Sequence, residues 1–399
     1  MHWAAGRLRV CVVAPTGSGK TELAVALLGT GRALWVAHTR DLVLQTARRL
    51  RALLGQSAVG VILAGHYPDS SARIQVGTVQ TLVARGLRPG ADVIVLDEAH
   101  HYMAEHWRQL ADAYPGIPCV GLTATPQRGD GEPLGDIFDE LVSTASYSQL
   151  IAGGFLVPAR VLQPPMQLGN DLAQEPVTAW EKYSEGSRTF LFCPRVEIAE
   201  FYAKAFRDRG ILFGVIEANT PRVEREELLA RFRTGALRGL ANVNTLTEGI
   251  DVPEARCVML ARGFGHVGAY LQAVGRVLRP AKDKADAIVI DLCGATLRHG
   301  LPTQDRVYSL QGRPISGEAP EREQGERDAF SQNVRGLDLK IAAGAAPIPF
   351  GLPPPVDDSE RRAEFERLRA LARQHRMRDG FAAAKFKEKF GEWPKEEWT

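Results

Sequence analysis

The sequence has few cysteines and almost no net charge, and both features exclude classes of protein. Its five cysteines stand singly, without the C-x-x-C pairs that bind zinc or perform redox chemistry, so we expect buried thiols in a reducing cytoplasm. No apolar run approaches the roughly 18 residues that span a bilayer, and no basic-then-apolar secretion signal follows Met1. Because the formal net charge is only +2, any nucleic-acid surface must be a local patch.

The pattern of apolar residues predicts two α/β domains in tandem. A chain of 399 residues exceeds what one hydrophobic core usually holds. Apolar runs of strand length alternate with helical periodicity, which is typical of parallel sheets, and the proline- and glycine-containing break at Gln163 to Gly186 separates two such sets. We expect strands at Leu8–Ala14, Ala33–Ala37, Arg73–Val76, Val93–Leu96, Cys119–Leu122, Thr189–Cys193, Ile211–Ile216, Gly239–Val243, Arg256–Leu260 and Ala287–Asp291.

The C-terminal quarter of the chain is predicted to differ from these two domains, which we place at residues 1–145 and 146–310. Residues 311–356 are rich in glycine, proline and charge, so we expect a linker or loop. Residues 357–399 are predicted to form a helical tail, in which positions 360–390 hold ten basic and five acidic residues. Aromatic residues lie among its lysines, a mixture suited to DNA phosphates and bases; alternatively, the aromatics dock the tail onto the second domain.

A glycine-rich loop follows the first predicted strand. It reads A-P-T-G-S-G-K-T from Ala14 to Thr21, and a helix-like segment follows it. Such a loop at a helix N-terminus points backbone N–H groups at phosphate oxygens, while a lysine reaches the β- and γ-phosphates and a hydroxyl holds Mg²⁺. Ala14 replaces the usual first glycine. We expect ATP to be bound by Thr16, Gly17, Ser18, Gly19, Lys20 and Thr21.

The sequence D-E-A-H, from Asp97 to His100, ends a predicted strand of the same domain. A carboxylate at that sheet edge is placed to hold Mg²⁺ together with Thr21, and the next carboxylate, Glu98, to polarise the attacking water. His100 and His101 are not expected to bind a metal, because Mg²⁺ prefers oxygen ligands. We expect His100 to couple chemistry to motion.

With these residues in place, seven ordered motifs between residues 8 and 300 resemble the superfamily 2 helicases and translocases. The resemblance is to the DEAH-box subtype, in the branch of DNA-repair helicases, phage helicases and restriction-enzyme motors. The motifs are A-P-T-G-S-G-K-T, A-H-T-R-D-L-V-L-Q, V-G-T-V-Q-T-L, D-E-A-H, L-T-A-T-P, T-L-T-E-G-I-D-V-P and Q-A-V-G-R-V-L-R-P. The resemblance implies two RecA-like domains with ATP and Mg²⁺ in the cleft between them, and a DNA-stimulated ATP hydrolase.

The resemblance also implies roles for residues outside the phosphate loop. Gln272, Arg276 and Arg279 are spaced to share one face of a helix, from which the arginines can neutralise charge on the γ-phosphate when the domains close. Thr123 and Thr125 would link hydrolysis to domain movement, and Gly249 and Asp251 would contact the nucleotide. The nucleic-acid path would follow Thr39, Arg40, Gly77, Thr78, Gln80, Pro194, Asn244 and Thr245.

The leading interpretation is an ATP-dependent DNA helicase or translocase of prokaryotic or phage origin. DNA is favoured over RNA because the sixth motif and the D-E-A-H box followed by His101 look like those of DNA-acting members. The alternatives are a duplex translocase that does not separate strands and an ATP-gated clamp or scaffold. Related proteins recognise adenine with a segment before the first strand, where only Met1 to Arg7 stand here, so we expect a truncated start or weak base recognition.

Overall fold

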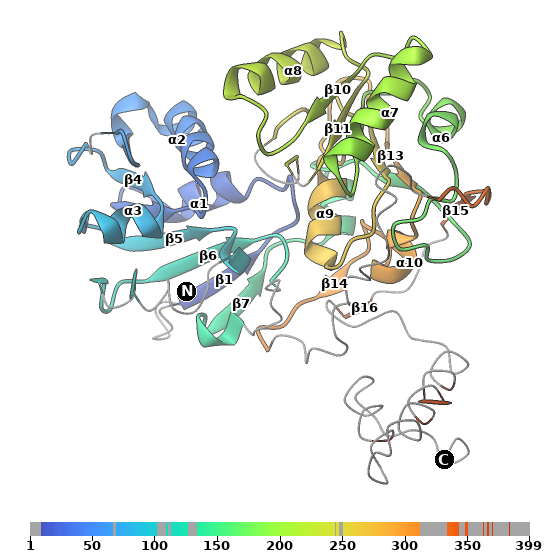
Figure 1. The fold of residues 1–399 in the computed structure, drawn as a ribbon. Coiled ribbons are helices and arrows are strands. Elements are labelled where there is room, and N and C mark those ends of the chain that lie inside the picture. The colour runs from blue at the N-terminus through green and yellow to red at the C-terminus, as the bar shows by residue number, and fades with distance from the viewer. Residues whose placement is uncertain are drawn as a thin grey trace.

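The computed structural model of the chain consists of two α/β domains, each built on a seven-stranded sheet (Figure 1). This arrangement confirms the predicted pair of α/β units. The described residues are 9–66, 69–101, 109–110, 113–126, 134–243, 245–246, 250–311, 333–342, 348–349 and the single positions 362, 365, 366, 369 and 383.

The sheet of the first domain is parallel throughout, in the order β3-β4-β2-β5-β6-β1-β7. Its inner strands are short, valine-rich and buried on both faces, as a sheet covered by helices requires. All five strands expected here are present, and β3 and β7 were not predicted. The elements are β1 (Arg9–Val13), α1 (Lys20–Leu28), β2 (Ala33–Val36), α2 (Arg40–Leu54), β3 (Val59–Ile62), β4 (Ile74–Gly77), α3 (Val79–Ala84), β5 (Val93–Asp97), η3 (Ala99–His101), β6 (Cys119–Thr123) and β7 (Glu140–Ser143).

The second sheet has the order β10-β11-β9-β12-β13-β8-β15, and all of its pairs except β15 with β8 are parallel. The five strands expected here are present, and β8 and β15 were not predicted. The elements are α5 (Tyr147–Ala152), β8 (Ala159–Gln163), α6 (Pro176–Tyr183), β9 (Thr189–Phe192), α7 (Val196–Asp208), β10 (Phe213–Ile216), α8 (Arg222–Thr234), β11 (Gly239–Asn242), β12 (Cys257–Leu260), α9 (Val267–Gly275), β13 (Ala287–Asp291), α10 (Ala295–His299) and β15 (Lys340–Ile341).

The cysteines lie inside these two domains as free, buried thiols, as predicted. Burial raises the pKa of Cys11 and of Cys257 to about 12, so both remain protonated and poorly nucleophilic at neutral pH. The cysteines therefore pack the cores. They are Cys11, Cys119, Cys193, Cys257 and Cys293.

After α10 the chain returns to the first domain, through residues 301–311, which we call the return segment. Its Tyr308 and Leu310 pack against the core of the first domain, and the Gly135 N–H donates to the Leu310 carbonyl over 2.9 Å. Asp305 accepts a hydrogen bond from the Ser148 N–H over 3.0 Å. Within the return segment, β14 (Arg306–Val307) pairs with β16 (Ile348–Pro349). The domains are thus joined by two crossings of the chain.

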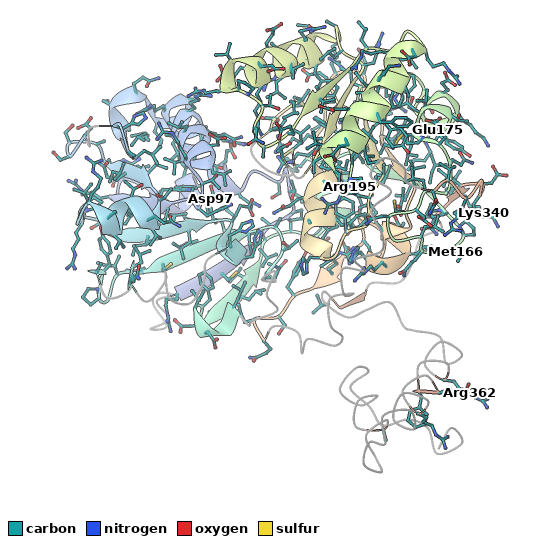
Figure 2. The ribbon with its side chains drawn as sticks, viewed as in Figure 1. Asp97, Met166, Glu175, Arg195, Lys340 and Arg362 are labelled. Carbon is teal, nitrogen blue, oxygen red and sulfur yellow. The ribbon has the colours of Figure 1, made fainter. Side chains whose placement is uncertain are left out.

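Part of the predicted linker is a strand instead, because β15 within residues 333–342 forms the edge of the second sheet. Lys340 and Ile341 pair antiparallel with β8, and Arg335 forms an ion pair with Asp171. Lys340 lies at the outer side of the second domain, away from Asp97 (Figure 2). Leu337, Leu339 and Ile341 alternate with polar residues, a strand pattern too short to stand out beside the surrounding glycines and prolines.

The predicted helical tail lies outside the described residues except at five positions, all of them helical: Arg362, Phe365, Glu366, Arg369 and Ala383. Phe365 is buried, and the Arg369 guanidinium lies 5.8 Å from the centre of its ring. In the described part of the chain, every helix is too short or too polar to cross a membrane.

Candidate functional site

The glycine-rich loop joins β1 to α1, and its backbone suits the binding of an anion. Gly17 and Gly19 have φ angles of 88° and 85°, a conformation that glycine adopts without strain. The loop ends at the N-terminus of α1, where backbone N–H groups and the helix dipole favour negative charge. The hydroxyls of Thr16 and Ser18 are buried and have no hydrogen-bond partner among the described residues. Buried hydroxyls need partners, and phosphate oxygens would supply them.

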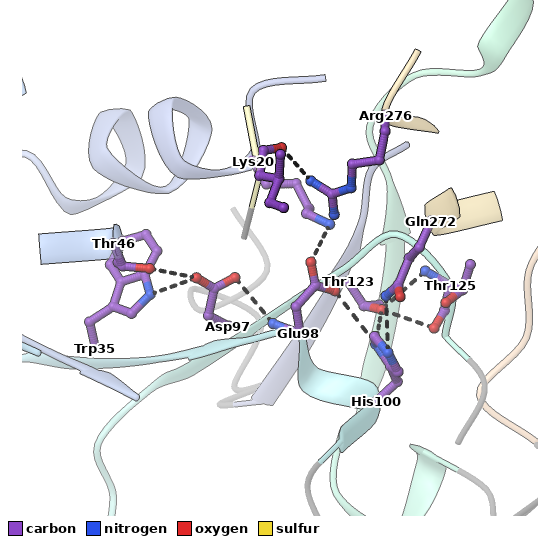
Figure 3. A network of polar contacts seen from close by, with 11 residues as sticks. Lys20, Trp35, Thr46, Asp97, Glu98, His100, Thr123, Thr125, Gln272 and Arg276 are labelled. Atoms are coloured by element: carbon purple, nitrogen blue, oxygen red, sulfur yellow. Dashed lines mark hydrogen bonds and ion pairs between the residues drawn. The ribbon is translucent and has the colours of Figure 1, made fainter. Parts of the chain in front are cut away.

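Glu98 faces this loop from the end of β5 (Figure 3). Its carboxylate Oε1 lies 3.0 Å from the Lys20 Nζ, and both side chains are largely buried. The backbone φ of Glu98 is 50°, a left-handed conformation that is costly for a residue with a Cβ. Strain of this kind persists only where surrounding structure enforces it, and here it accompanies a carboxylate turned toward the phosphate loop.

Asp97 lies beside Glu98 in an environment that suits a cation. Its Oδ2 accepts hydrogen bonds of 3.2 Å from the Trp35 indole and from the Thr46 hydroxyl. Burial and the neighbouring Glu98 carboxylate raise the pKa of Asp97 to about 6. A carboxylate destabilised in this way gains from a nearby Mg²⁺, for which Thr21 at the start of α1 offers a second oxygen. Within the described residues, no cluster of three His, Cys, Asp or Glu residues is arranged for a metal ion.

His100 connects the first domain to the second. The Thr123 hydroxyl donates to the Thr125 carbonyl over 2.9 Å, so it accepts from the His100 Nδ1–H, also at 2.9 Å. This tautomer leaves the His100 Nε2 as an acceptor for the Gln272 amide, 3.4 Å away across the domain boundary (Figure 3). Glu98 Oε2 lies 3.6 Å from the same Nδ1. Predicted residues from four motifs thus meet in one network.

Arg279 does not share a helix face with Gln272, so that part of the prediction is wrong. Helix α9 ends at Gly275, Arg276 follows as its C-cap, and Arg279 lies in a bend. Pro280 keeps Arg279 out of the helix, because a proline disfavours helical backbone at the residue before it.

The two arginines nevertheless lie at the domain boundary, with different partners. Arg276 is buried and donates to the Ile250 carbonyl over 2.9 Å. Arg279 pairs with Asp251, and a Cβ added to Gly17 would lie 3.2 Å from the Arg279 Cγ. The Arg279 side chain therefore lies against the phosphate loop, where it can approach a γ-phosphate.

We expect Arg279→Ala to reduce the kcat of ATP hydrolysis more than it weakens nucleotide binding. The guanidinium would interact most strongly with charge that develops in the transition state, and such donors contribute on the order of a hundredfold to kcat. Steady-state kinetics together with a fluorescent-nucleotide titration would separate the two effects. Arg276→Ala should also lower kcat, with an added loss of stability because it leaves the Ile250 carbonyl unsatisfied. Unchanged kcat in both variants would assign these arginines to structure alone.

Helix α9 touches the first domain through two glycines. A Cβ added to Gly275 would lie 2.6 Å from the Thr16 Cβ, and one added to Gly268 would lie 2.9 Å from the Thr125 Oγ1. Both distances are shorter than real contacts of a Cβ. The absence of side chains at these positions is what lets the helix approach the phosphate loop.

Lys284 also belongs to this region, although it lies in none of the sequence motifs. Its amine donates to the carbonyls of Pro253 and Ala255 over 2.8 and 2.7 Å, and so holds the loop that contains Asp251. Burial, together with the nearby Arg279 cation, lowers the pKa of Lys284 to about 7. Of the residues predicted beside this loop, Gly249 lies outside the described residues.

The lowered pKa of Lys284 predicts a pH dependence of stability. The folded state favours the neutral amine, so this site's contribution is lost as the pH falls through about 7 and grows with pH up to the ordinary lysine value. Lys284→Met removes the titration. The free energy of unfolding of the wild type minus that of this variant should therefore be larger at about pH 9 than at about pH 6, as measured by urea unfolding. An equal difference at both pH values would contradict this account.

The predicted nucleic-acid contacts follow the carboxyl ends of neighbouring strands in both sheets. In the first domain, Thr39 and Arg40 follow β2, whereas Gly77 ends β4 and Thr78 and Gln80 follow it. The hydroxyls of Thr39 and Thr78 cap α2 and α3 by accepting from backbone N–H groups.

In the second domain, Pro194 follows β9, and the Thr245 hydroxyl, after β11, donates to the Ile216 carbonyl over 3.1 Å. Asn244 lies outside the described residues. Thr39, Thr78 and Thr245, which are predicted to contact nucleic acid, therefore also form hydrogen bonds within the protein. What they share is their position at one edge of each sheet, the edge at which ligands of open α/β sheets bind.

Taken together, the fold and the site define a class: a protein of two α/β domains whose glycine-rich loop belongs to one domain and whose motif arginines belong to the other. Residues 2–128 match the family described as "Type III restriction enzyme, res subunit", and residues 171–281 match the "Helicase conserved C-terminal domain". The chain belongs to the superfamily 2 helicases and translocases.

Individual relatives agree with this assignment. The chain is 27% identical over 73% of its length to a "51.5 kDa protein" of a Lactococcus phage, and 26% identical over 71% to the "DNA 3'-5' translocase XPB2" of Sulfurisphaera tokodaii. These matches span 67% and 77% of the relatives, and others span as little as 42%.

A solved structure shows the same fold. The helicase Lhr of Mycobacterium smegmatis superimposes with a TM-score of 0.51 over 74% of this chain and 46% of that protein, at 19% identity. Two RecA-like domains are thus the architecture of this chain, as predicted. Its helicase domains imply an ATP-hydrolysing enzyme, and members of this family use ATP, usually with Mg²⁺.

Proposed function

We propose that this protein is a DNA-stimulated ATPase that moves along DNA by closing and reopening the cleft between its domains. One observation supports this most directly: the second domain contacts the phosphate loop and the D-E-A-H segment of the first, through Gln272 against His100 and Arg279 against Gly17. Because residues of both domains form the site, the reaction in the site depends on the relative position of the two domains.

The chain's own residues account for the steps of hydrolysis. The loop amides and Lys20 would bind the β- and γ-phosphates, and Thr21 and Asp97 would hold Mg²⁺, which neutralises phosphate charge when bound. Lys20 is paired with Glu98 in this structure. When Lys20 turns to a phosphate, Glu98 is released to orient the attacking water. Arg276 and Arg279 would then neutralise charge on the transferred group.

DNA is the proposed track because the curated relative XPB2 is named a DNA translocase. The edge that contains Thr39, Arg40 and Thr78 offers hydroxyl and backbone N–H groups, which suit phosphates without selecting a base sequence. Thr39 Oγ1 accepts from the Leu42 N–H, so its own proton remains available to a phosphate oxygen.

The test is the rate of ATP hydrolysis by the purified protein with single-stranded, duplex or forked DNA, or RNA of matched length. We expect stimulation by at least one form of DNA and less by RNA. The control is the Arg40→Ala variant, which should raise the DNA concentration needed for half-maximal stimulation. A hydrolysis rate that no nucleic acid changes would refute the proposal.

A second candidate is a translocase that moves on duplex DNA without separating strands, which the name of the relative XPB2 and the match to a restriction-enzyme subunit favour. Displacement of a triplex-forming strand measures translocation, whereas displacement of a base-paired strand measures unwinding. Triplex displacement without strand separation would favour this second function. ATP hydrolysis without either displacement would favour an ATP-gated clamp.

A further inference from the structure

Three histidine rings connect the edge proposed to bind DNA with the catalytic network. The rings of His38 and His101 lie 4.1 Å apart, centre to centre, with their planes tilted by 30°. The rings of His101 and His100 are also 4.1 Å apart and are tilted by 40°. These distances and angles describe three flat side chains packed in a row, each ring tilted against the next.

The backbone explains why the three rings meet. Strands β2 and β5 are neighbours in the sheet, so the segments that follow their carboxyl ends lie side by side. His38 is the second residue after β2, and His100 and His101 belong to the η3 turn that follows β5. The His101 N–H donates to the Glu98 carbonyl over 3.0 Å, which fixes η3 to the strained catalytic residue.

The two ends of the row have different neighbours. At one end, His100 contacts Thr123 and, across the domain boundary, Gln272. At the other end, His38 immediately precedes Thr39, the N-cap of α2, and Arg40. A displacement of the loop after β2 must therefore move the His38 ring, which can be accommodated only by moving His101 or by breaking the stack.

A metal site is a poor explanation for this group of histidines. Rings whose centres lie 4.1 Å apart contact each other directly, and their planes are tilted by 30° and 40°. The described residues also lack a cluster of three ligands arranged for a metal. The geometry is that of packing between two loops.

We propose that the row of His38, His101 and His100 transmits DNA binding at the loop after β2 to ATP hydrolysis at Glu98, with His38 as a positioning residue. The inference rests on the proposed DNA-stimulated ATPase. DNA held at Thr39 and Arg40 fixes the His38 ring, which sets His101 and then the orientation of His100. His100 in that orientation keeps its contacts with Thr123 and Gln272, and the closed site is stabilised.

The test compares His38→Ala with His38→Phe in the full chain. Alanine removes the ring, and we expect DNA stimulation of kcat to fall by about fivefold or more, within the usual range of coupling between sites. The ATPase rate without DNA, the KM for ATP and the affinity for DNA should stay close to those of the wild type. Phenylalanine restores a flat ring, so stimulation should return in large part.

Two further variants test whether the effect on DNA stimulation is specific to the row of histidines. His66→Ala removes a histidine of the same domain that lies outside the row, and it should leave stimulation intact. The His38→Ala/His101→Ala double variant should be no less stimulated than the worse single variant, because both changes interrupt one path.

The outcomes are distinct. Full stimulation of His38→Ala overturns the inference and leaves the proposed function standing. Loss of the basal rate in both His38 variants also overturns it, since the ring would then be needed for folding or chemistry rather than coupling. A wild-type protein that no DNA stimulates refutes the proposed function itself, and this inference with it.

Discussion

Replacing Glu98 with glutamine should leave ATP binding nearly intact and slow hydrolysis by about a hundredfold or more. Glutamine has the same shape and its Oε1 can still accept from Lys20, whose Nζ lies 3.0 Å from Glu98 Oε1 in the structure, so the loop should keep its geometry. What is lost is the carboxylate that orients and polarises the attacking water. Single-turnover hydrolysis of radiolabelled ATP, beside a binding titration with a fluorescent nucleotide, measures the two quantities separately.

The contrast with Lys20→Ala makes this result specific. Removing the lysine takes away the cation that would contact the phosphates. It also removes the ion pair that Lys20 forms with the buried Glu98. Nucleotide affinity should therefore fall together with turnover. Near-normal turnover in Glu98→Gln would show that another group activates the water.

Gly275→Ala should lower the DNA-stimulated kcat by about tenfold or more, because the added methyl group separates α9 from the phosphate loop. The new Cβ would lie 2.6 Å from the Thr16 Cβ and 2.7 Å from its Cγ2. Either α9 moves away or Thr16 is displaced, and in both cases Arg276 and Arg279 lose their approach to the site. Steady-state kinetics with saturating DNA would measure the loss.

The same substitution should not unfold the protein, which separates this effect from general damage. Alanine is a better helix former than glycine by up to about 1 kcal/mol, so α9 itself gains. The matched control is Gly265→Ala, just before α9, where an added Cβ meets nothing within 4 Å. We expect its kinetics to match the wild type. If Gly275→Ala hydrolyses ATP at the wild-type rate, close approach of α9 to the loop is not needed for catalysis.

The features predicted from the sequence are those encoded within a few consecutive residues. The strand before the phosphate loop is a continuous apolar run, and the loop and the D-E-A-H box are contiguous motifs, so each could be located without the fold. Strand β7 was missed because its four residues are only partly buried and show no clear alternation. The prediction of a helix through Arg279 was wrong because residue spacing does not show that α9 ends at Gly275 or that Pro280 disfavours helical backbone at Arg279.

The remaining features depend on contacts between distant parts of the chain. The two hydrogen bonds of Lys284 to a loop some thirty positions earlier leave no pattern in the sequence. The contact between His38 and His101 could not be predicted from the sequence, because more than sixty positions separate the two residues. They meet because β2 and β5 are neighbours in the sheet. The roles of the individual site residues stay predictions until the variants above are measured.

The return segment should affect the rate at which the cleft between the two domains closes. Because Tyr308 and Leu310 pack on the first domain while the chain before them belongs to the second, the domains are held at two points rather than one. Tethering of this kind gives the facing surfaces a high effective concentration, in the millimolar range for short flexible connections. After each opening, Arg279 therefore meets the phosphate loop again by a short intramolecular search. In the proposed cycle we therefore expect the chemistry or product release, rather than the meeting of the domains, to set the cycle time.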